Sequence, residues 1–425
     1  MTTMTRRTIG LAAATAAMMG TTALWAQEGD PIIIGGLATL EGPFAEPGED
    51  GLRGVELAIQ EFGAEIDGRP VELITASSDG NPDVALEAAR RLVEQDGADI
   101  LVGPLSGSEG IRLAQYAKEQ PGTTFINGGS AAIETTLVDP AENFFRFNTD
   151  GAQWTAPLGE YVVNERGWDN IVIVSEDYSF PYAQIFGFMA TYCEAGGTVQ
   201  DKFFTPVGTN DYSSIIAQLP LEQGEVDGMF IVLGGSDAVD FLSQYAQMGG
   251  QLPIIGGTNA ADQTVLTTQG PARQLLPGTL TAGPVSDGAE IEPWQTFVQQ
   301  YKDYFGDEGL PSPSVFAYNY YTNTKAAMLA LQEVGGDLSD DHAALNEALS
   351  NLEFTSPTGT VSLNDNRQAT AAIYINEIVE REDGNLVSEP LARVEEVDQF
   401  LGLGEETYSQ LGLPSRDNPS CPTNG

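Results

Sequence analysis

The chain has 425 residues, with 18 Lys and Arg against 61 Asp and Glu, and its formal net charge is −43. Hydrophobic residues make up 41% of the sequence, as in ordinary globular proteins, and the length predicts two or three domains. The charge argues against nucleic acid and against anionic membrane surfaces, because proteins that bind either one carry basic patches. One His and two Cys exclude a multi-histidine or four-thiolate zinc site, and we expect no metal and no cofactor.

Residues 1–26 have the pattern of a secretory signal peptide. Arg6 and Arg7 precede a mildly apolar run over 8–24, and Ala26 is a small residue suited to cleavage. The residues around the two arginines also fit a twin-arginine export signal loosely, so both export routes stay open. The apolar run is short and weak for a membrane anchor. We expect an exported protein that is soluble in the periplasm.

Export bears on the redox state of the two cysteines. Cys193 and Cys421 form an even pair in an oxidising compartment, which favours a disulfide between the C-terminal tail and the helix that carries Cys193. Two unpaired thiols are the alternative.

Short β-branched strands alternate with amphipathic helices along the mature chain. The first series has strands predicted at 32–35, 71–75, 100–102 and 123–126 and helices at 50–62, 82–95 and 109–118. The second series has helices predicted at 152–165, 182–195, 212–219 and 238–248 and strands at 171–174, 199–204, 228–233 and 253–255. This alternation predicts an α/β fold with parallel sheets, and each series has the size of one doubly wound domain.

The last part of the chain breaks this alternation. It has helices predicted at 294–305, 316–334 and 342–349, followed by a hairpin of 360–363 and 371–377 with Asn364–Asn366 as its turn. We interpret these elements as additions to the two domains that the first and second series form, which are called the first and second lobes below. His342 lies at the acidic start of the third of these helices, and we expect it to be a solvated residue with no part in a catalytic triad.

The loops that leave the strands are where a site is expected, because open α/β sheets bind ligands beyond the carboxyl ends of their strands. Loops 103–109 and 127–130 are rich in Gly and Ser, and the first leads into a helix. Free backbone N–H groups at a helix N-terminus favour an anion such as a carboxylate. Simple tight turns are the alternative. The first loop lacks the P-loop lysine, and no GxGxxG opens the first helix.

The second lobe adds a carboxylate and aromatic surface. Asp150 can cap the helix over 152–165, pair with a ligand cation, or do both. Together with Phe44 from the first lobe, Trp154, Tyr178 and Phe180 can line an apolar pocket, although each is also a common core residue.

The loops resemble those of the periplasmic solute-binding proteins of ABC importers, type I, in the leucine/isoleucine/valine-binding branch. The resemblance is carried, in chain order, by IGGLATLEGPFAEPG, DILVGPLSGSEG, FINGGSAA, FFRFNTD, IVIVSEDYSF, DGMFIVLGG and SPTGTVSLNDNRQ. It implies two Rossmann-like doubly wound lobes joined by a three-crossover hinge, with a cleft that closes on ligand. The first lobe would comprise 27–148 plus 280–352, and the second 149–279 plus 353–425.

The resemblance also implies a set of ligand-binding residues. A ligand carboxylate would be held by Ser106, Gly107, Ser108, Gly129 and Ser130. An ammonium would be held by Asp150, and Phe180 would cover the ligand.

Three site positions depart from the family pattern. Gly107, flanked by Ser106 and Ser108, aligns most closely with the family's usual carboxylate-binding Ser. Ser236 stands where a Tyr is usual, and Thr258 stands where a second acid holds an amino group. The loss of that acid leaves room for an aromatic or aliphatic acid, or an amide, beside a hydrophobic amino acid.

We therefore expect a monomeric, non-enzymatic protein that delivers a small solute to the membrane permease subunits of an ABC importer. The alternative is a ligand-sensing module of the same fold in a receptor or regulator. An enzyme based on Glu176 and Asp177 fits less well, because adjacent side chains point apart. The many acids predict an acidic surface suited to salty water.

Overall fold

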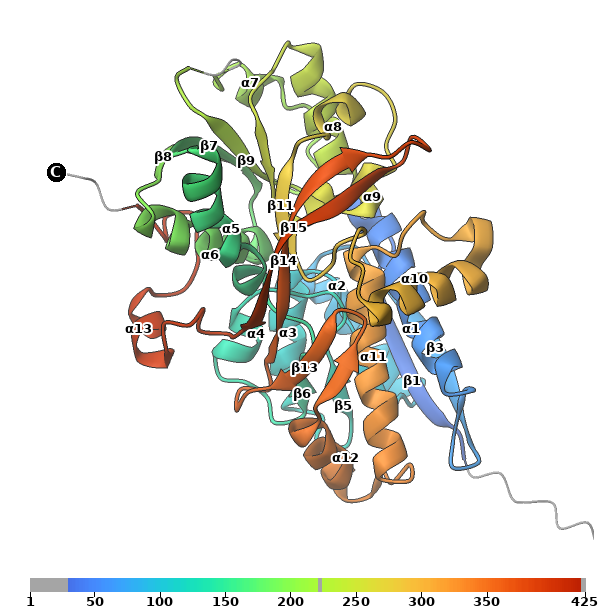
Figure 1. The fold of residues 1–425 in the computed structure, drawn as a ribbon. Helices are drawn as coiled ribbons and strands as arrows, with labels where there is room; N and C mark the ends of the chain where they lie inside the picture. Colours follow the sequence, from blue (N-terminus) through green and yellow to red (C-terminus); the bar gives the residue numbers. More distant parts are fainter. Residues whose placement is uncertain (1–29, 221–223, 422–425) are drawn as a thin grey trace, which may run out of the picture.

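The computed structural model describes residues 30–220 and 224–421. The predicted signal peptide, residues 1–26, lies outside the described residues. The chain forms two α/β lobes, each built on its own sheet (Figure 1). The prediction of two doubly wound α/β lobes is therefore confirmed.

The first lobe is built on a six-stranded sheet in the order β2-β3-β1-β4-β5-β6. Its strands are β1 (Ile32–Thr39), β2 (Glu65–Ile66), β3 (Arg69–Ser78), β4 (Ile100–Val102), β5 (Thr124–Ile126) and β6 (Phe144–Phe145). Its helices are α1 (Ala45–Glu61), α2 (Pro82–Arg90), α3 (Gly107–Ala117) and α4 (Glu134–Leu137). Because strand side chains alternate between faces, Leu37 and Leu101 pack with α2 and α3, while Ile34 and Val102 pack with α1.

The second lobe is built on a nine-stranded sheet. Eight strands follow the order β12-β13-β14-β11-β10-β9-β7-β8, and β15 pairs with β14. The strands are β7 (Asn170–Glu176), β8 (Thr198–Thr205), β9 (Gly228–Val232), β10 (Ile254–Gly256), β11 (Leu280–Gly283), β12 (Phe354–Ser356), β13 (Gly359–Leu363), β14 (Ala369–Glu380) and β15 (Leu386–Val397). The helices are α5 (Gly151–Arg166), α6 (Ser179–Glu194), α7 (Ser213–Ile216), α8 (Gly235–Gln247) and α9 (Gln263–Leu266).

Three helices of the last part of the chain pack on the first lobe. They are α10 (Glu292–Phe305), α11 (Val315–Glu333) and α12 (Ser339–Asn351). In α11, Tyr320 donates its hydroxyl hydrogen to the carbonyl oxygen of Leu37 on β1 at 2.8 Å. One boundary differs from the proposed division, because β11 pairs in parallel with β10 inside the second sheet. The chain therefore leaves the second lobe after Gly283, and not at 279.

The predicted hairpin of the last part is present. β13 and β14 pair antiparallel, with Leu363 opposite Ala369. The partner of β14 on its other edge, β15, was not predicted, because its sequence is polar and largely exposed along EPLARVEEV.

His342 is buried, so the expectation of a solvated residue was wrong. Its Nδ1 lies 3.1 Å from Thr124 Oγ1 in the first sheet. Asp340, Asp341 and His342 have φ between 51° and 59°, a left-handed turn at the start of α12 that carries the ring inward. Burial lowers the pKa of His342.

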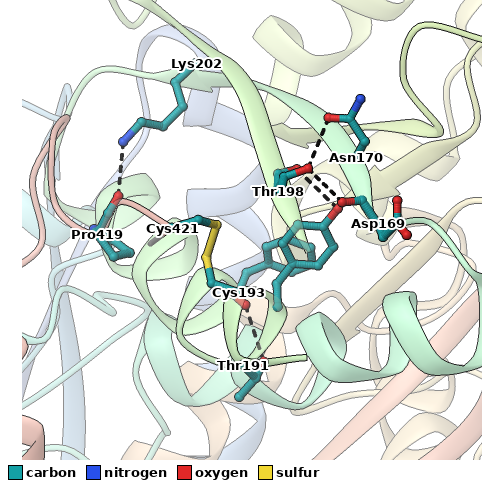
Figure 2. The surroundings of a disulfide bond; sticks show 10 residues. Asp169, Asn170, Thr191, Cys193, Thr198, Lys202, Pro419 and Cys421 are labelled. Atoms are coloured by element: carbon teal, nitrogen blue, oxygen red, sulfur yellow. Dashed lines mark hydrogen bonds between the residues drawn. A yellow bond between two sulfur atoms is a disulfide. The ribbon is translucent and has the colours of Figure 1, made fainter. Parts of the chain in front are cut away.

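The C-terminal tail leaves β15 and runs along the second lobe beside α6 (Figure 1). Its short helix α13 (Glu405–Gln410) buries Tyr408, whose ring centroid lies 5.7 Å from that of Phe186 on α6. Further on, Cys421 is joined to Cys193 of α6 by a disulfide (Figure 2). No helix in residues 30–220 or 224–421 is long and apolar enough to cross a membrane.

Candidate functional site

The strand-exit loops of the two lobes meet at one interface. Ser108 Oγ, in the first turn of α3, lies 3.1 Å from Ser179 Oγ at the start of α6. A Cβ atom added to Gly107 would lie 3.0 Å from Cβ of Phe180, so this glycine allows the two helices to approach. The lobes are therefore closed on each other at the loops where a ligand site was predicted.

The first-lobe side of this interface is the N-terminus of α3. Ser106 precedes the helix, and the buried carboxylate of Glu109 accepts hydrogen bonds from the backbone N–H groups of Ser106 and Gly80, both at 3.1 Å. Burial raises the pKa of Glu109 to about 7. Backbone N–H groups in the first turn of a helix have no partner within the helix, so those of Gly107 and Ser108 can serve an anion.

The loop after β5 is better explained as a tight turn. The backbone N–H groups of Gly129 and Ser130 both donate to the carbonyl oxygen of Pro104, at 2.9 and 3.1 Å. Ser130 Oγ is buried, and it occupies the space beside α3 where a Cβ of Gly110 would fall. The backbone N–H groups of these two predicted carboxylate ligands therefore serve the turn, while the buried hydroxyl of Ser130 has no hydrogen-bond partner among the described residues.

The four predicted aromatic residues form one continuous set. The ring centroids of Phe44 and Tyr178 are 6.4 Å apart, those of Tyr178 and Phe180 are 6.3 Å apart, and those of Phe180 and Trp154 are 5.7 Å apart. Phe44 comes from the first lobe and the other three come from the second, so the set spans the interface. Trp154 also donates its indole N–H to Thr149 Oγ1 at 2.8 Å.

Asp150 takes the helix-cap role that the sequence left open. Its Oδ1 accepts hydrogen bonds from the N–H groups of Ala152 and Gln153 in the first turn of α5, both at 3.0 Å. Its Oδ2 lies 3.6 Å from Nη2 of Arg146, and both side chains are fully buried. Burial raises the pKa of Asp150. The carboxylate predicted to hold an ammonium is thus paired inside the protein.

The remaining two predicted positions, Thr258 and Ser236, have surroundings that differ from each other. Thr258 Oγ1 accepts from Gln184 Nε2 at 2.8 Å and donates to the carbonyl oxygen of Ala282 at 2.6 Å. Ser236 is exposed and lines a pocket of about 350 Å³ between the 42–47 segment of the first lobe and α8. The structure thus brings Ser106–Ser108 and the aromatic residues together and leaves Ser236 at the rim.

Two polar side chains beside the aromatic set were not predicted from the sequence as ligand-binding residues. Glu176, at the end of β7, is buried, and it accepts a hydrogen bond from the N–H of Gly234 at 3.1 Å. Burial raises its pKa well above the usual range. Asn259 Oδ1 is buried without a protein partner, and a Cβ on Gly234 would lie 3.2 Å from Cβ of Asn259 and 3.0 Å from Phe44 Cε1. Glu176 is the last residue of β7 and Asn259 follows β10, so a position at the end of a strand is the signal that could have found them.

Comparisons with known proteins identify the family. The profile described as periplasmic binding protein matches residues 31–385. The chain belongs to the periplasmic binding protein family. The family resemblance inferred from the strand-exit loops is therefore confirmed.

Individual relatives of this periplasmic binding protein agree with the family assignment. A Leu/Ile/Val-binding protein homolog 6 from Brucella melitensis is 23% identical over 370 residues, which cover 86% of this chain and 92% of the relative. An ABC transporter substrate-binding protein from Sphaerobacter thermophilus has a TM-score of 0.77 and 27% identity, covering 87% of this chain and 99% of that one. A solute-binding protein of an ABC transporter from R. palustris, in complex with benzoate, has a TM-score of 0.78 and 23% identity, covering 88% and 100%. This protein is a solute-binding protein and not an enzyme.

Proposed function

We propose that this protein is the extracytoplasmic solute-binding component of an ABC importer and that it captures a small carboxylate-bearing solute between its lobes. The observation that carries the proposal is the meeting of the α3 N-terminus, at Ser108, with the aromatic set that runs from Phe44 to Trp154. The helix end offers N–H donors to an anion, and the rings offer an apolar wall. The loaded protein would hand its solute to the membrane permease subunits.

Within this class we favour an aromatic or aliphatic acid over an α-amino acid, with an amide as a further option. An ammonium group needs an acidic partner, but Asp150 is paired with Arg146, and Thr258 carries no charge. Four aromatic rings suit a flat apolar ligand. The R. palustris neighbour, in complex with benzoate, supports this choice, whereas the Brucella homologue's name points to leucine, isoleucine and valine.

The protonation of Glu109 bears on how an anion binds. Its carboxyl group lies at the N-terminus of α3 and has a pKa raised by burial to about 7. Below that pH the group is mostly neutral and does not repel a ligand carboxylate. We therefore expect the affinity for a carboxylate to fall as the pH rises from 6 to 8, and a Glu109→Gln variant to lose this dependence.

Mass spectrometry of small molecules released when the purified protein is unfolded would identify the solute directly. Calorimetric titration with benzoate, 4-hydroxybenzoate and L-leucine would then test the class. We expect one molecule to bind per chain. We also expect benzoate or 4-hydroxybenzoate to bind more tightly than L-leucine. The absence of both a copurified acid and any binding among the three probes would overturn the proposal.

Export is tested separately. We expect the N-terminus of the protein recovered from the periplasmic fraction to be Gln27, since residues 1–26 have the signal-peptide pattern. An intact N-terminus on protein retained in the cytoplasm would contradict it.

A further inference from the structure

We propose that the C-terminal tail is part of the solute-binding apparatus. In this view Arg416 positions the loop Asp177–Phe180, and the disulfide between Cys193 and Cys421 keeps Arg416 in place. The inference rests on the proposed function, because that loop carries two of the aromatic residues at the cleft.

Arg416 holds Asp177 with two contacts. Its Nε donates to Asp177 Oδ1 at 2.8 Å, and its Nη2 contacts Oδ2 of the same carboxylate. The guanidinium carbon lies 5.2 Å from the ring centroid of Phe204, and the hydroxyl of Tyr182 also donates to Asp177. Hydrogen bonding by Arg416 is the largest cause that lowers the pKa of Asp177. A bidentate Arg–carboxylate pair fixes direction as well as distance, so the tail sets the orientation of Asp177.

Asp177 leads directly into the residues that close the cleft. Tyr178 packs against Phe44 of the first lobe, and Ser179 lies 3.1 Å from Ser108 across the interface. Phe180 follows in the first turn of α6, where it meets Trp154. A shift in the backbone at Asp177 would therefore be passed to three consecutive cleft residues.

The tail around Arg416 makes few buried contacts. Residues 411–421 contain no helix or strand, and Pro414 is their one buried residue, while Leu411 and Leu413 are exposed. The amino group of Lys202 donates to the carbonyl oxygens of Arg416 and Pro419, at 2.6 and 3.2 Å, and Figure 2 shows the second of these bonds beside the disulfide. Exposed polar contacts of this kind are weak, because water competes for them and side-chain entropy opposes them.

The disulfide holds the tail near Asp177 more firmly than these polar contacts do. Cys421 follows Arg416 by five residues and is bonded to Cys193, near the C-terminal end of α6, the helix whose first turn carries Phe180. A short tether keeps Arg416 at a high local concentration beside Asp177, so that a weak pair stays formed most of the time. Reduction of the disulfide would therefore loosen the cleft loop.

Hydrogen exchange of the oxidised mature protein tests the first part of this proposal. The reporter is the peptide over 178–186, in which the N–H of Tyr182 is bonded to the carbonyl oxygen of Tyr178 at 3.3 Å. We expect exchange there to be at least tenfold faster in Arg416→Ala and in the double variant Cys193→Ser/Cys421→Ser. A reducing agent should reproduce the effect in the wild type and add nothing in the double variant. Unchanged exchange in both variants would overturn the proposal.

Two controls separate positioning from general loosening. Arg381→Ala removes an exposed arginine that makes two contacts with Glu389, at 3.1 and 2.6 Å, between β14 and β15, and it should leave the 178–186 peptide unchanged. Asp177→Asn should loosen the loop as Arg416→Ala does. Exchange in the variant that carries both changes should be no faster than in either single variant, because both changes remove the same interaction. Additive effects would contradict a positioning role.

The link to binding uses benzoate and L-leucine as probes. Any probe that binds the wild type should bind Arg416→Ala at least tenfold more weakly and Arg381→Ala with wild-type affinity. Equal affinity in all three proteins would reject the role in binding. If neither probe binds the wild type, the proposed ligand class fails, and the exchange measurements alone decide whether Arg416 positions the loop.

Discussion

Two Arg–Asp pairs lie at opposite extremes of burial in this protein. Arg146 and Asp150 are fully buried, and their closest charged atoms are 3.6 Å apart. Arg416 and Asp177 make a closer, bidentate pair, yet the arginine is 54% exposed. The comparison shows that a short contact does not measure structural importance, because the cost of removing a partner depends on whether water can replace it.

The surroundings of the buried pair explain why it belongs to the structure. Arg146 also donates to the carbonyl oxygen of Ala132 at 2.6 Å, to Thr136 Oγ1 at 2.7 Å and to the side chain of Gln368. These contacts join the end of the first sheet to the start of β14. The exposed pair instead joins a tail to one loop, so its loss should change the loop and little else.

The largest expected effect comes from breaking the buried pair. Arg146→Met should lower the free energy of unfolding by about 3–5 kcal/mol, because it leaves the carboxylate of Asp150 buried without a counter-ion. Urea unfolding followed by circular dichroism measures this. Arg166→Met, which breaks a half-exposed pair with Glu377, is the matched control and should cost much less. Equal losses of unfolding free energy in the two variants would contradict the claim that the buried pair contributes more to stability than the half-exposed pair.

Removal of the disulfide should have the second-largest effect on the free energy of unfolding. Cys193→Ser/Cys421→Ser is expected to lower the free energy of unfolding by about 2–4 kcal/mol, the usual range for a bond that constrains the unfolded chain. Reduced wild-type protein should unfold at the same urea concentration as the variant. Two titratable thiols in the unfolded, unreduced wild type would show instead that the bond is not formed.

The two aspartates should respond to pH with opposite signs. Burial raises the pKa of Asp150, so the unfolded chain ionises first, and the contribution of Asp150 to stability falls as the pH rises from about 3.8 to its folded-state pKa. The pKa of Asp177 is lowered, mainly by Arg416, so its contribution is present above about 3.8 and is lost as the pH falls below that value. Urea titrations of Asp150→Asn and Asp177→Asn against the wild type, from pH 3 to pH 7, measure both. Slopes of the same sign would contradict the assignment.

The smallest effect on stability is expected for Arg416→Ala. Its urea midpoint should match that of the wild type, since an exposed ion pair contributes little. The same variant should nevertheless show the faster loop exchange described above. A large fall in the urea midpoint would make Arg416 a general structural residue.

Much of the fold could be predicted, because its strands and helices have clear periodicity. The longer strands and helices from β1 to β10 overlap the predicted ranges, since buried strands such as Ile100–Val102 are uniformly apolar. The helix α1 begins at Ala45 and not at the predicted 50, and the short elements β2, α4 and β6 were not predicted. β15 was missed because only its first three residues and its last residue are buried, and the residues between them are partly or fully exposed and mostly polar. Periodicity reports burial, so a polar strand whose position is set by its neighbour leaves little trace in the sequence.

The site was predictable in part for the same reason. The loops that carry Ser108 and Phe180 follow strands, and the topology brings them together. The role of Asp150 depended on Arg146, four residues earlier, whose burial could not be read from a chain rich in exposed charges. His342 likewise sits in an acidic stretch, and only the left-handed turn before it carries the ring inside.

The measurement that most directly tests carboxylate capture at the α3 N-terminus is the affinity of Ser108→Asp for the acid identified in the purified protein. An acidic residue in the first turn of a helix favours folding, while it would repel a ligand carboxylate held there. Ser350→Asp, on the exposed face of α12, is the matched control. We predict that Ser108→Asp binds more than tenfold more weakly than the wild type and that Ser350→Asp binds equally well. Wild-type affinity in Ser108→Asp would contradict the assignment of the site.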